Sequence, residues 1–144
     1  MGGGTLRNCT VTANRGRGVG GVECSGWQMV NCVVFGNTAT TNYWVEGTSP
    51  EYKTDSPSRI VSCLFADPLF VDAENLDFHL QKGSSAINVG TYGTWMDAAT
   101  DLDGNPRAKH VKRYRSTGEV KRAYVDLGCY ETEWRGPGFL LMFR

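Results

Sequence analysis

A six-residue phrase occurs three times in the first half of the chain and constrains its fold more than any other feature. Its pattern is an apolar residue, any residue, Asn or Ser, Cys, any residue and a second apolar residue. The copies occupy residues 6–11, 29–34 and 60–65, so that their starts lie 23 (29 − 6) and 31 (60 − 29) residues apart. A spacing in this range indicates stacked units of supersecondary structure.

The apolar positions within the phrase are the first, fourth and sixth, and they cannot all share one face of a flat strand. They can all point inward if the backbone bends at the third position. Asn tolerates the left-handed conformation that such a corner requires. A corner repeated in every turn predicts a parallel β-helix of about three coils. The alternative is three unrelated strands of an ordinary β-sandwich.

The expected β-helix places equivalent residues of the three copies in ladders. The polar corner residues should form a ladder whose amides hydrogen-bond along the stack. The chain has five cysteines, and three of them occupy equivalent inward positions, where free thiols pack as small apolar side chains. No cysteine spacing indicates a zinc site. The inward ladders are Leu6/Met29/Ile60, Cys9/Cys32/Cys63 and Val11/Val34/Phe65, and the corner ladder is Asn8/Asn31/Ser62.

Charge and hydropathy exclude two classes of partner. Fifteen basic and fifteen acidic residues cancel, which argues against nucleic acid or an anionic membrane surface as a partner. No apolar run approaches the roughly 20 residues of a membrane-spanning helix, and the first residues do not resemble a signal peptide.

Because Leu6 already lies within a repeat, we expect the chain to be the tail of a longer protein. An open coil edge would favour self-association.

Four ordered motifs in the second half carry a family resemblance. They are ADPLFVD (66–72), DFHLQKGSSAINVG (77–90), DLDGNPR (101–107) and VDLGCYE (125–131). Together with the repeats NCTVTAN (8–14) and NCVVFGNTA (31–39), they resemble the C-terminal region of exported bacterial right-handed β-helix proteins of the pectin-lyase-like group, often labelled choice-of-anchor Q domain proteins. The resemblance implies an extracellular or cell-surface protein with a right-handed β-helix and frequent association with carbohydrate. It implies no particular reaction.

The resemblance and the repeats together divide the chain into three parts. Residues 1–66 are the expected coils, 67–132 a non-repetitive closing region, and 133–144 an apolar tail. An insertion at about 108–125 reads as a hairpin with a basic surface, suited either to an acidic polysaccharide or to solvent. The basic residues proposed to bind a ligand are Arg107, Lys109, His110, Lys112, Arg113 and Arg115.

Two further groups of residues are candidates for binding. Tyr43 and Trp44 could stack on a sugar ring or pack against the coils. Asp101, Asp103 and Asn105 resemble the start of a calcium loop, or else form a tight turn through local hydrogen bonds. An EF-hand is excluded, because its twelfth position would be a lysine. No cofactor is expected, except calcium if these three residues bind it in a loop of another kind.

No motif identifies a catalytic residue. His79 and His110 lack a nearby nucleophile motif, and His79 is expected to face solvent between Phe78 and Leu80. We therefore expect a non-catalytic C-terminal part of an exported β-helix protein, which closes the solenoid and binds carbohydrate. The alternative is part of a polysaccharide lyase or glycoside hydrolase whose active site lies on upstream coils or loops.

Overall fold

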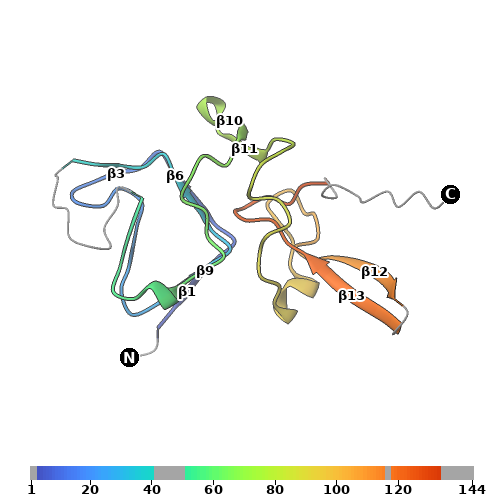
Figure 1. Ribbon diagram of the computed structural model, residues 1–144. Helices are drawn as coiled ribbons and strands as arrows, with labels where there is room; N and C mark the ends of the chain where they lie inside the picture. The colour runs from blue at the N-terminus through green and yellow to red at the C-terminus, as the bar shows by residue number, and fades with distance from the viewer. Residues whose placement is uncertain (1–2, 41–50, 116–117, 134–144) are drawn as a thin grey trace.

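The structure is a computed structural model that describes residues 3–40, 51–115 and 118–133, with only the backbone at 112–115 and 118–122. Within these residues the protein is all-β, with short strands, three short stretches of 3-10 helix and no α-helix (Figure 1). The first half contains β1 (Thr5–Arg7), β2 (Thr10–Thr12), β3 (Arg15–Gly16), β4 (Val22–Cys24), β5 (Gln28–Val30), β6 (Val33–Phe35), β7 (Thr38–Ala39), β8 (Tyr52–Thr54), η1 (Pro57–Arg59) and β9 (Ile60–Val61). The second half contains β10 (Phe70–Asp72), η2 (Ala73–Asn75), β11 (Asp77–Leu80), η3 (Thr94–Ala98), β12 (Lys109–Arg115) and β13 (Gly118–Tyr124).

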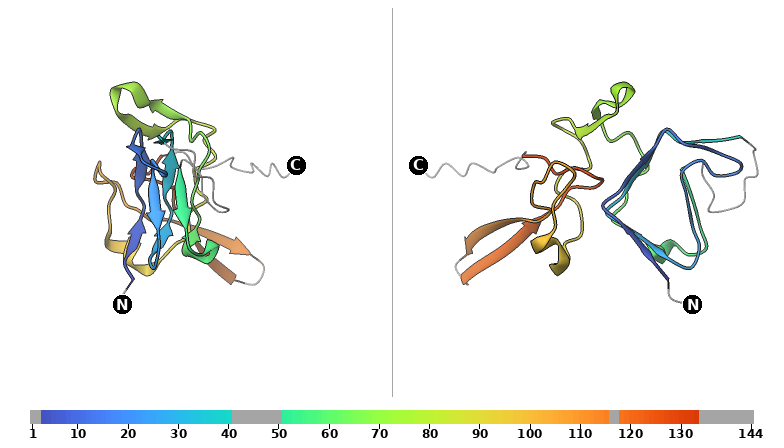
Figure 2. Two further views of the ribbon diagram at one scale, coloured as in Figure 1. Left: turned by 90° about the vertical axis from the view of Figure 1, so that its left-hand side faces the viewer. Right: turned by 180° about the vertical axis from the view of Figure 1, so that it is seen from behind.

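Parallel pairing brings the three copies of the phrase side by side. β1 pairs with β5 and β5 with β9, so that Leu6 is opposite Met29 and Met29 is opposite Ile60. β2 pairs with β6 and aligns Val11 with Val34. The pairs β3–β7 and β4–β8 continue this arrangement in small separate sheets. Successive turns of chain lie over one another (Figures 1 and 2), and we call β1–β9 the strand stack.

The third residue of each phrase forms a left-handed corner, as predicted. Asn8, Asn31 and Ser62 have φ angles of 49°, 56° and 48°. This conformation is uncommon outside glycine, and Asn adopts it more readily than most residues. Because the chain bends at this point, side chains on both sides of the corner can face the same interior.

One apolar cluster fills the interior of the strand stack. Met29, Cys32 and Val34 have no exposed surface at its centre. Complete burial of a side chain the size of valine or methionine contributes about 1.5–3 kcal/mol to stability. All nine residues predicted to point inward belong to this cluster, which confirms the three inward ladders: Leu6, Met29, Ile60, Cys9, Cys32, Cys63, Val11, Val34 and Phe65.

A ladder of hydrogen-bonded amides is present, but at a different corner from the predicted one. Asn37 Oδ1 accepts hydrogen bonds of 3.0 Å from both the backbone N–H and the side-chain amide of Asn14. The Asn37 amide in turn donates to Glu51 Oε2 at 2.7 Å. Two successive turns of chain are therefore joined through Asn14 and Asn37, and Glu51, which lies in the same turn as Asn37 just before β8, holds the Asn37 amide.

The left-handed corners attach the strand stack to the second half of the chain. The Asn31 amide donates to the Thr91 carbonyl oxygen and accepts from the Thr91 N–H, both at 2.8 Å. Ser62 Oγ lies 2.6 Å from Thr91 Oγ1. Both side-chain polar atoms of Asn8 are buried without a hydrogen-bond partner. The amide ladder predicted at these corners is thus wrong, because the bend directs Asn31 and Ser62 toward Thr91.

The closing region contains two antiparallel strand pairs. β10 pairs with β11, and β12 pairs with β13 from Lys109 opposite Tyr124 to Arg115 opposite Gly118. The second pair is the hairpin predicted at about 108–125. Met96, Ala108 and Val125 pack together where this hairpin leaves the body of the closing region.

The closing region lies along the side of the strand stack and contacts all three turns of chain. The Cys129 N–H donates to Thr10 Oγ1 at 3.1 Å, in the first turn. The Gly128 N–H donates to the Asn31 carbonyl oxygen at 2.9 Å, in the second. The contact of Ser62 with Thr91 ties the third. A second apolar cluster seals this interface and contains Val33, Phe35, Leu64, Phe70, Leu80, Ala86, Ile87 and Leu127.

Glycine replacements at two corners separate backbone conformation from side-chain bonding. Asn31→Gly and Asn8→Gly both leave a residue that accepts positive φ. Asn31→Gly also removes both hydrogen bonds to Thr91, so we expect the free energy of unfolding to fall by about 1–3 kcal/mol. Asn8→Gly removes no hydrogen bond and should change it by less than about 1 kcal/mol. Urea denaturation measures both values, and equal losses would contradict this account of the corners.

Candidate functional site

The structure separates the basic residues that the sequence analysis grouped together. Tyr43 and Trp44, and the side chains of Lys112, Arg113 and Arg115, lie outside the described residues. The three remaining candidates are Arg107, Lys109 and His110. Only His110 among these three is exposed.

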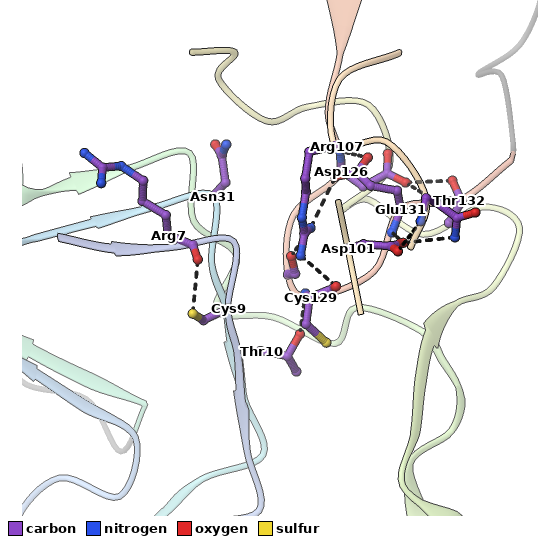
Figure 3. Close-up of polar contacts among 12 residues, drawn as sticks. Arg7, Cys9, Thr10, Asn31, Asp101, Arg107, Asp126, Cys129, Glu131 and Thr132 are labelled. Carbon is purple, nitrogen blue, oxygen red and sulfur yellow. Dashed lines mark hydrogen bonds and ion pairs between the residues drawn. The ribbon is translucent and has the colours of Figure 1, made fainter. Parts of the chain in front are cut away.

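Arg107 is buried in a network between two of the family-like motifs. Its guanidinium donates to the carbonyl oxygens of Gly128 at 2.9 Å and Cys129 at 2.7 Å. It also pairs with Glu131 Oε1 at 3.3 Å, and both side chains are almost completely buried. Figure 3 shows Arg107 beside Glu131 and Asp126 and reaching toward Cys129. Arg107 therefore joins the motifs at 101–107 and 125–131 and takes no part in an exposed binding surface.

The carboxylates of Asp101, Asp126 and Glu131 are buried around Arg107 (Figure 3). Most of their oxygens accept N–H groups. Asp126 accepts from the backbone N–H of Asn88 and of Thr132, both at 2.6 Å. Glu131 Oε2 accepts from the Asp126 N–H at 3.0 Å. Burial raises the pKa of Glu131 to about 7, and the neighbouring Asp126 carboxylate acts in the same direction. The side-chain amine of Lys109 opposes this rise.

The turn at 101–105 uses its carboxylate for local hydrogen bonds. Asp101 Oδ1 accepts the N–H groups of Asp103 at 2.9 Å and Asn105 at 2.8 Å. Asp101 Oδ2 accepts the Asn105 amide at 3.1 Å and the Glu131 N–H at 2.8 Å. The Asp103 carboxylate instead bonds His79. This geometry matches the tight turn, and calcium binding at Asp101, Asp103 and Asn105 stays a prediction without a shared oxygen cage to support it.

Lys109 is also turned away from solvent at its charged end. Its Nζ atom is buried and has no hydrogen-bond partner in the described part of the chain. With Arg107 in the buried network, two of the predicted ligand-binding cations are thus directed inward. The charged ends of Arg107 and Lys109 are thus buried, and the ligand binding predicted for the basic residues of this segment stays a prediction.

His110 belongs instead to an exposed cluster of aromatic and charged side chains, which we call the Trp95 surface (Arg7, Tyr92, Trp95, Asp97 and His110). His110 Nε2 lies 2.7 Å from Asp97 Oδ1, and the Tyr92 hydroxyl donates to both Asp97 oxygens at 2.9 and 2.8 Å. Trp95 is 44% exposed and Tyr92 37% exposed. Arg7 Cζ lies 5.7 Å from the centroid of the Trp95 ring.

Local packing explains why these side chains face outward. Met96 is buried against Ala108 and Val125, which anchors η3 and leaves its neighbours Trp95 and Asp97 exposed. Gly93 precedes η3, and a Cβ atom there would lie 2.9 Å from Trp95 Nε1. Glycine is therefore needed at this position for the observed placement of the indole ring.

The hydrogen bonds of the Trp95 surface determine its charge. The Tyr92 hydroxyl, and then His110, lower the pKa of Asp97, which keeps this carboxyl ionised at neutral pH. The same contact with Asp97 raises the pKa of Tyr92. The surface thus combines a fixed carboxylate, an arginine and two aromatic rings. Such a set can bind a ligand that has both apolar and charged faces, and it offers no activated nucleophile.

The sequence analysis did not identify Tyr92, Trp95 or Asp97. They lie in the segment between two motifs, where two aromatic residues alternate with Gly93 and threonines. Aromatic residues in a short segment rich in glycine and threonine are a usable signal for an exposed aromatic surface. Arg7 is distant in sequence and reaches this surface only through the fold.

A second titratable cluster of the closing region contains Asp77, His79, Asp103 and Tyr130. His79 Nδ1 contacts Asp77 Oδ1, and His79 Nε2 lies 2.7 Å from Asp103 Oδ2. The imidazole stacks on Tyr130, with ring centroids 3.9 Å apart. Hydrogen bonds to Asp103 and then Asp77 raise the pKa of His79. The side chain is 41% exposed and the residue as a whole is half-buried, so the predicted exposure of His79 is confirmed only in part.

Comparison of the chain with known protein families, with curated proteins and with solved structures finds no match. No helix in the described ranges is sufficiently long and apolar to cross a membrane. The description of the site therefore depends on its geometry.

Removal of Arg107 should be costly, because it leaves a buried carboxylate without its cation. We expect Arg107→Met to lower the free energy of unfolding by about 3–5 kcal/mol. Arg17→Met, at an exposed arginine of the strand stack, is the matched control and should cost less than about 0.5 kcal/mol. Chemical denaturation measures both. Similar values for the two variants would show that the buried network contributes little.

The His79 cluster should stabilise the protein most in mildly acidic solution. The pKa of His79 is higher in the folded protein than in the unfolded chain, where it is about 6.5. The cluster therefore contributes its full stabilisation below pH 6.5, and this contribution is lost as the pH rises through the folded-state pKa. The lowered pKa of Asp77 gives stability that is lost in acid, below its usual value of 3.8. We therefore expect the difference in Tm between the wild type and His79→Gln to shrink as the pH is raised from 6 to 9.

Thermal unfolding at matched ionic strength tests this dependence. Asp103→Asn, which removes the main cause of the raised pKa, should show a weaker dependence on pH than the wild type. A difference in Tm that grows with pH would contradict the assignment of the imidazolium to this cluster.

Proposed function

We propose that the protein is the C-terminal part of an exported β-helix protein and binds an acidic carbohydrate at the Trp95 surface. The observation that carries the proposal is the exposed Trp95 ring with the guanidinium of Arg7 beside it. Exposed aromatic rings provide the broad apolar contact that a sugar ring can stack on.

The β-helix part of the proposal draws its support from the strand stack. A coiled ribbon of short strands has three features that the strand stack shares. These are parallel register between equivalent residues, a left-handed corner in each turn and one apolar interior. The right-handed coil and the exported location come from the resemblance in the sequence. In this proposal the closing region packs along the side of the coils and stabilises them.

The preference for an acidic ligand depends on Arg7. This residue is exposed, and no carboxylate is paired with it in the part of the chain that the structure describes. Arginine binds carboxylates through a planar fork of donors and also stacks on aromatic faces. A uronic acid could therefore place its ring near Trp95 and its carboxylate on Arg7.

The non-catalytic assignment follows from the groups on the Trp95 surface. Hydrolysis of a glycosidic bond generally needs two facing carboxyl groups, whereas this surface has Asp97 alone. Both Asp97 oxygens are already bonded to Tyr92. The alternative, part of a lyase or hydrolase with its site on upstream coils, differs from our proposal in predicting new reducing or unsaturated ends when a matching polysaccharide is supplied.

Binding of polygalacturonate and of a neutral polysaccharide tests the proposal. Trp95→Ala should weaken binding of both polymers by about two- to tenfold, since an aromatic contact contributes about 0.5–1.5 kcal/mol. Arg7→Gln should weaken binding of the acidic polymer alone. The matched control is Arg15→Gln in β3, an exposed arginine on the opposite side of the strand stack (Figure 1).

Isothermal titration calorimetry measures the affinities, and assays for new reducing and unsaturated ends accompany each titration. Equal binding by the wild type and Trp95→Ala would refute the Trp95 surface as the site. Turnover by the wild type would favour the enzymatic alternative. Size-exclusion chromatography during the same work tests the predicted self-association through the coil edge.

A further inference from the structure

Sulfur atoms line the interior of the strand stack. Four cysteines and Met29 belong to the same apolar cluster, and all these cysteines are free thiols. The proposed carbohydrate site makes no use of them. The four cysteines are Cys9, Cys24, Cys32 and Cys63.

Three of these thiols form a column across successive turns of chain. The Val33 N–H donates to the Cys9 carbonyl oxygen and the Leu64 N–H to the Cys32 carbonyl oxygen, both at 2.9 Å. Cys9, Cys32 and Cys63 therefore occupy equivalent positions on adjacent strands. The central Cys32 is completely buried, whereas both outer thiols retain some exposure.

The spacing of the column fits two-coordinate metal binding. Neighbouring strands in a sheet lie about 4.8 Å apart. With a metal–sulfur bond of about 2.3 Å, the length of a zinc–thiolate bond, a cation held in line between two thiolates separates the two sulfur atoms by about 4.6 Å. No group of three or more His, Cys, Asp or Glu is placed to hold a metal among the described residues. The column needs only two sulfur atoms for each ion.

We propose that this column binds a soft monovalent cation, Cu(I), between the sulfur of Cys32 and that of either Cys9 or Cys63. Thiolate and thioether ligands select Cu(I) over harder cations. Met29 is fully buried in the same cluster and supplies a thioether near the column. The apolar surroundings also exclude water that would compete for the ion.

Binding releases two protons, one from each coordinating thiol, and the two thiolates with one monovalent cation carry a net charge of −1. The cation must displace both protons, so the affinity should increase with pH.

Anaerobic titration of the reduced protein with Cu(I), in competition with bicinchoninate, tests the proposal. Ag(I) serves as a probe of the same charge that undergoes no redox chemistry. We expect one ion per chain and tighter binding at pH 8 than at pH 6. Cys32→Ala removes the sulfur common to both pairs and should weaken binding by at least about 100-fold, since even the loss of supporting groups costs 10- to 100-fold.

The outer cysteines give a test that does not depend on the central replacement. Cys9→Ala and Cys63→Ala should each retain one pair and bind one ion, whereas the double variant should lose the site. Cys24→Ala and Cys129→Ala are matched controls, because Cys24 lies in β4, outside the column, and Cys129 lies in the closing region. Circular dichroism verifies the fold of each variant.

Tight binding by the double variant, or by a folded Cys32→Ala protein, would overturn the proposal. Loss of binding in Cys129→Ala would overturn it as well, because the ion would then lie outside the strand stack. Failure of carbohydrate binding leaves this test unaffected, since the two sites share no residue.

Discussion

The left-handed backbone at Asn8, Asn31 and Ser62 is the constraint on which the rest of the structure depends. It lets side chains before and after the corner enter one apolar interior, which a straight strand would not allow. The same bend turns the Asn31 amide outward, where it holds both backbone groups of Thr91. The chain reaches Trp95 four residues later. The backbone conformation at Asn31 thus helps to position the segment that carries the Trp95 surface.

The repeated phrase was sufficient to predict the parallel register, the corners and the inward ladders, because each follows from local spacing and from the conformations that Asn tolerates. The position of the amide ladder could not be predicted in the same way. It joins Asn14 to Asn37, and the carboxylate of Glu51, from the segment just before β8, holds the Asn37 amide. Spacing alone cannot show that a glutamate from another part of the same turn bonds this asparagine.

The candidate site was predicted less well, for a physical reason that Arg107 illustrates. Seen in sequence, Arg107 is one of a group of basic residues. In the fold it joins two motifs and is buried with Glu131. Whether a charge is buried depends on partners 24 positions away, and no local pattern encodes that contact. His110 is exposed as predicted from its basic segment. Its contacts with Tyr92 and Asp97 depend on the packing of β12 against the segment that contains η3, which no local pattern encodes.

The contact of the closing region with every turn of the strand stack has a consequence for folding. Arrays of repeats that touch only their neighbours can gain or lose structure one unit at a time. Here Thr10 of the first turn is bonded to Cys129, 119 positions later. Contacts over such sequence separations carry a large loop-closure cost and slow the search for the native state. The stack should therefore reach its final rigidity only after almost the whole chain is available, and its turns should unfold together rather than fray from one end.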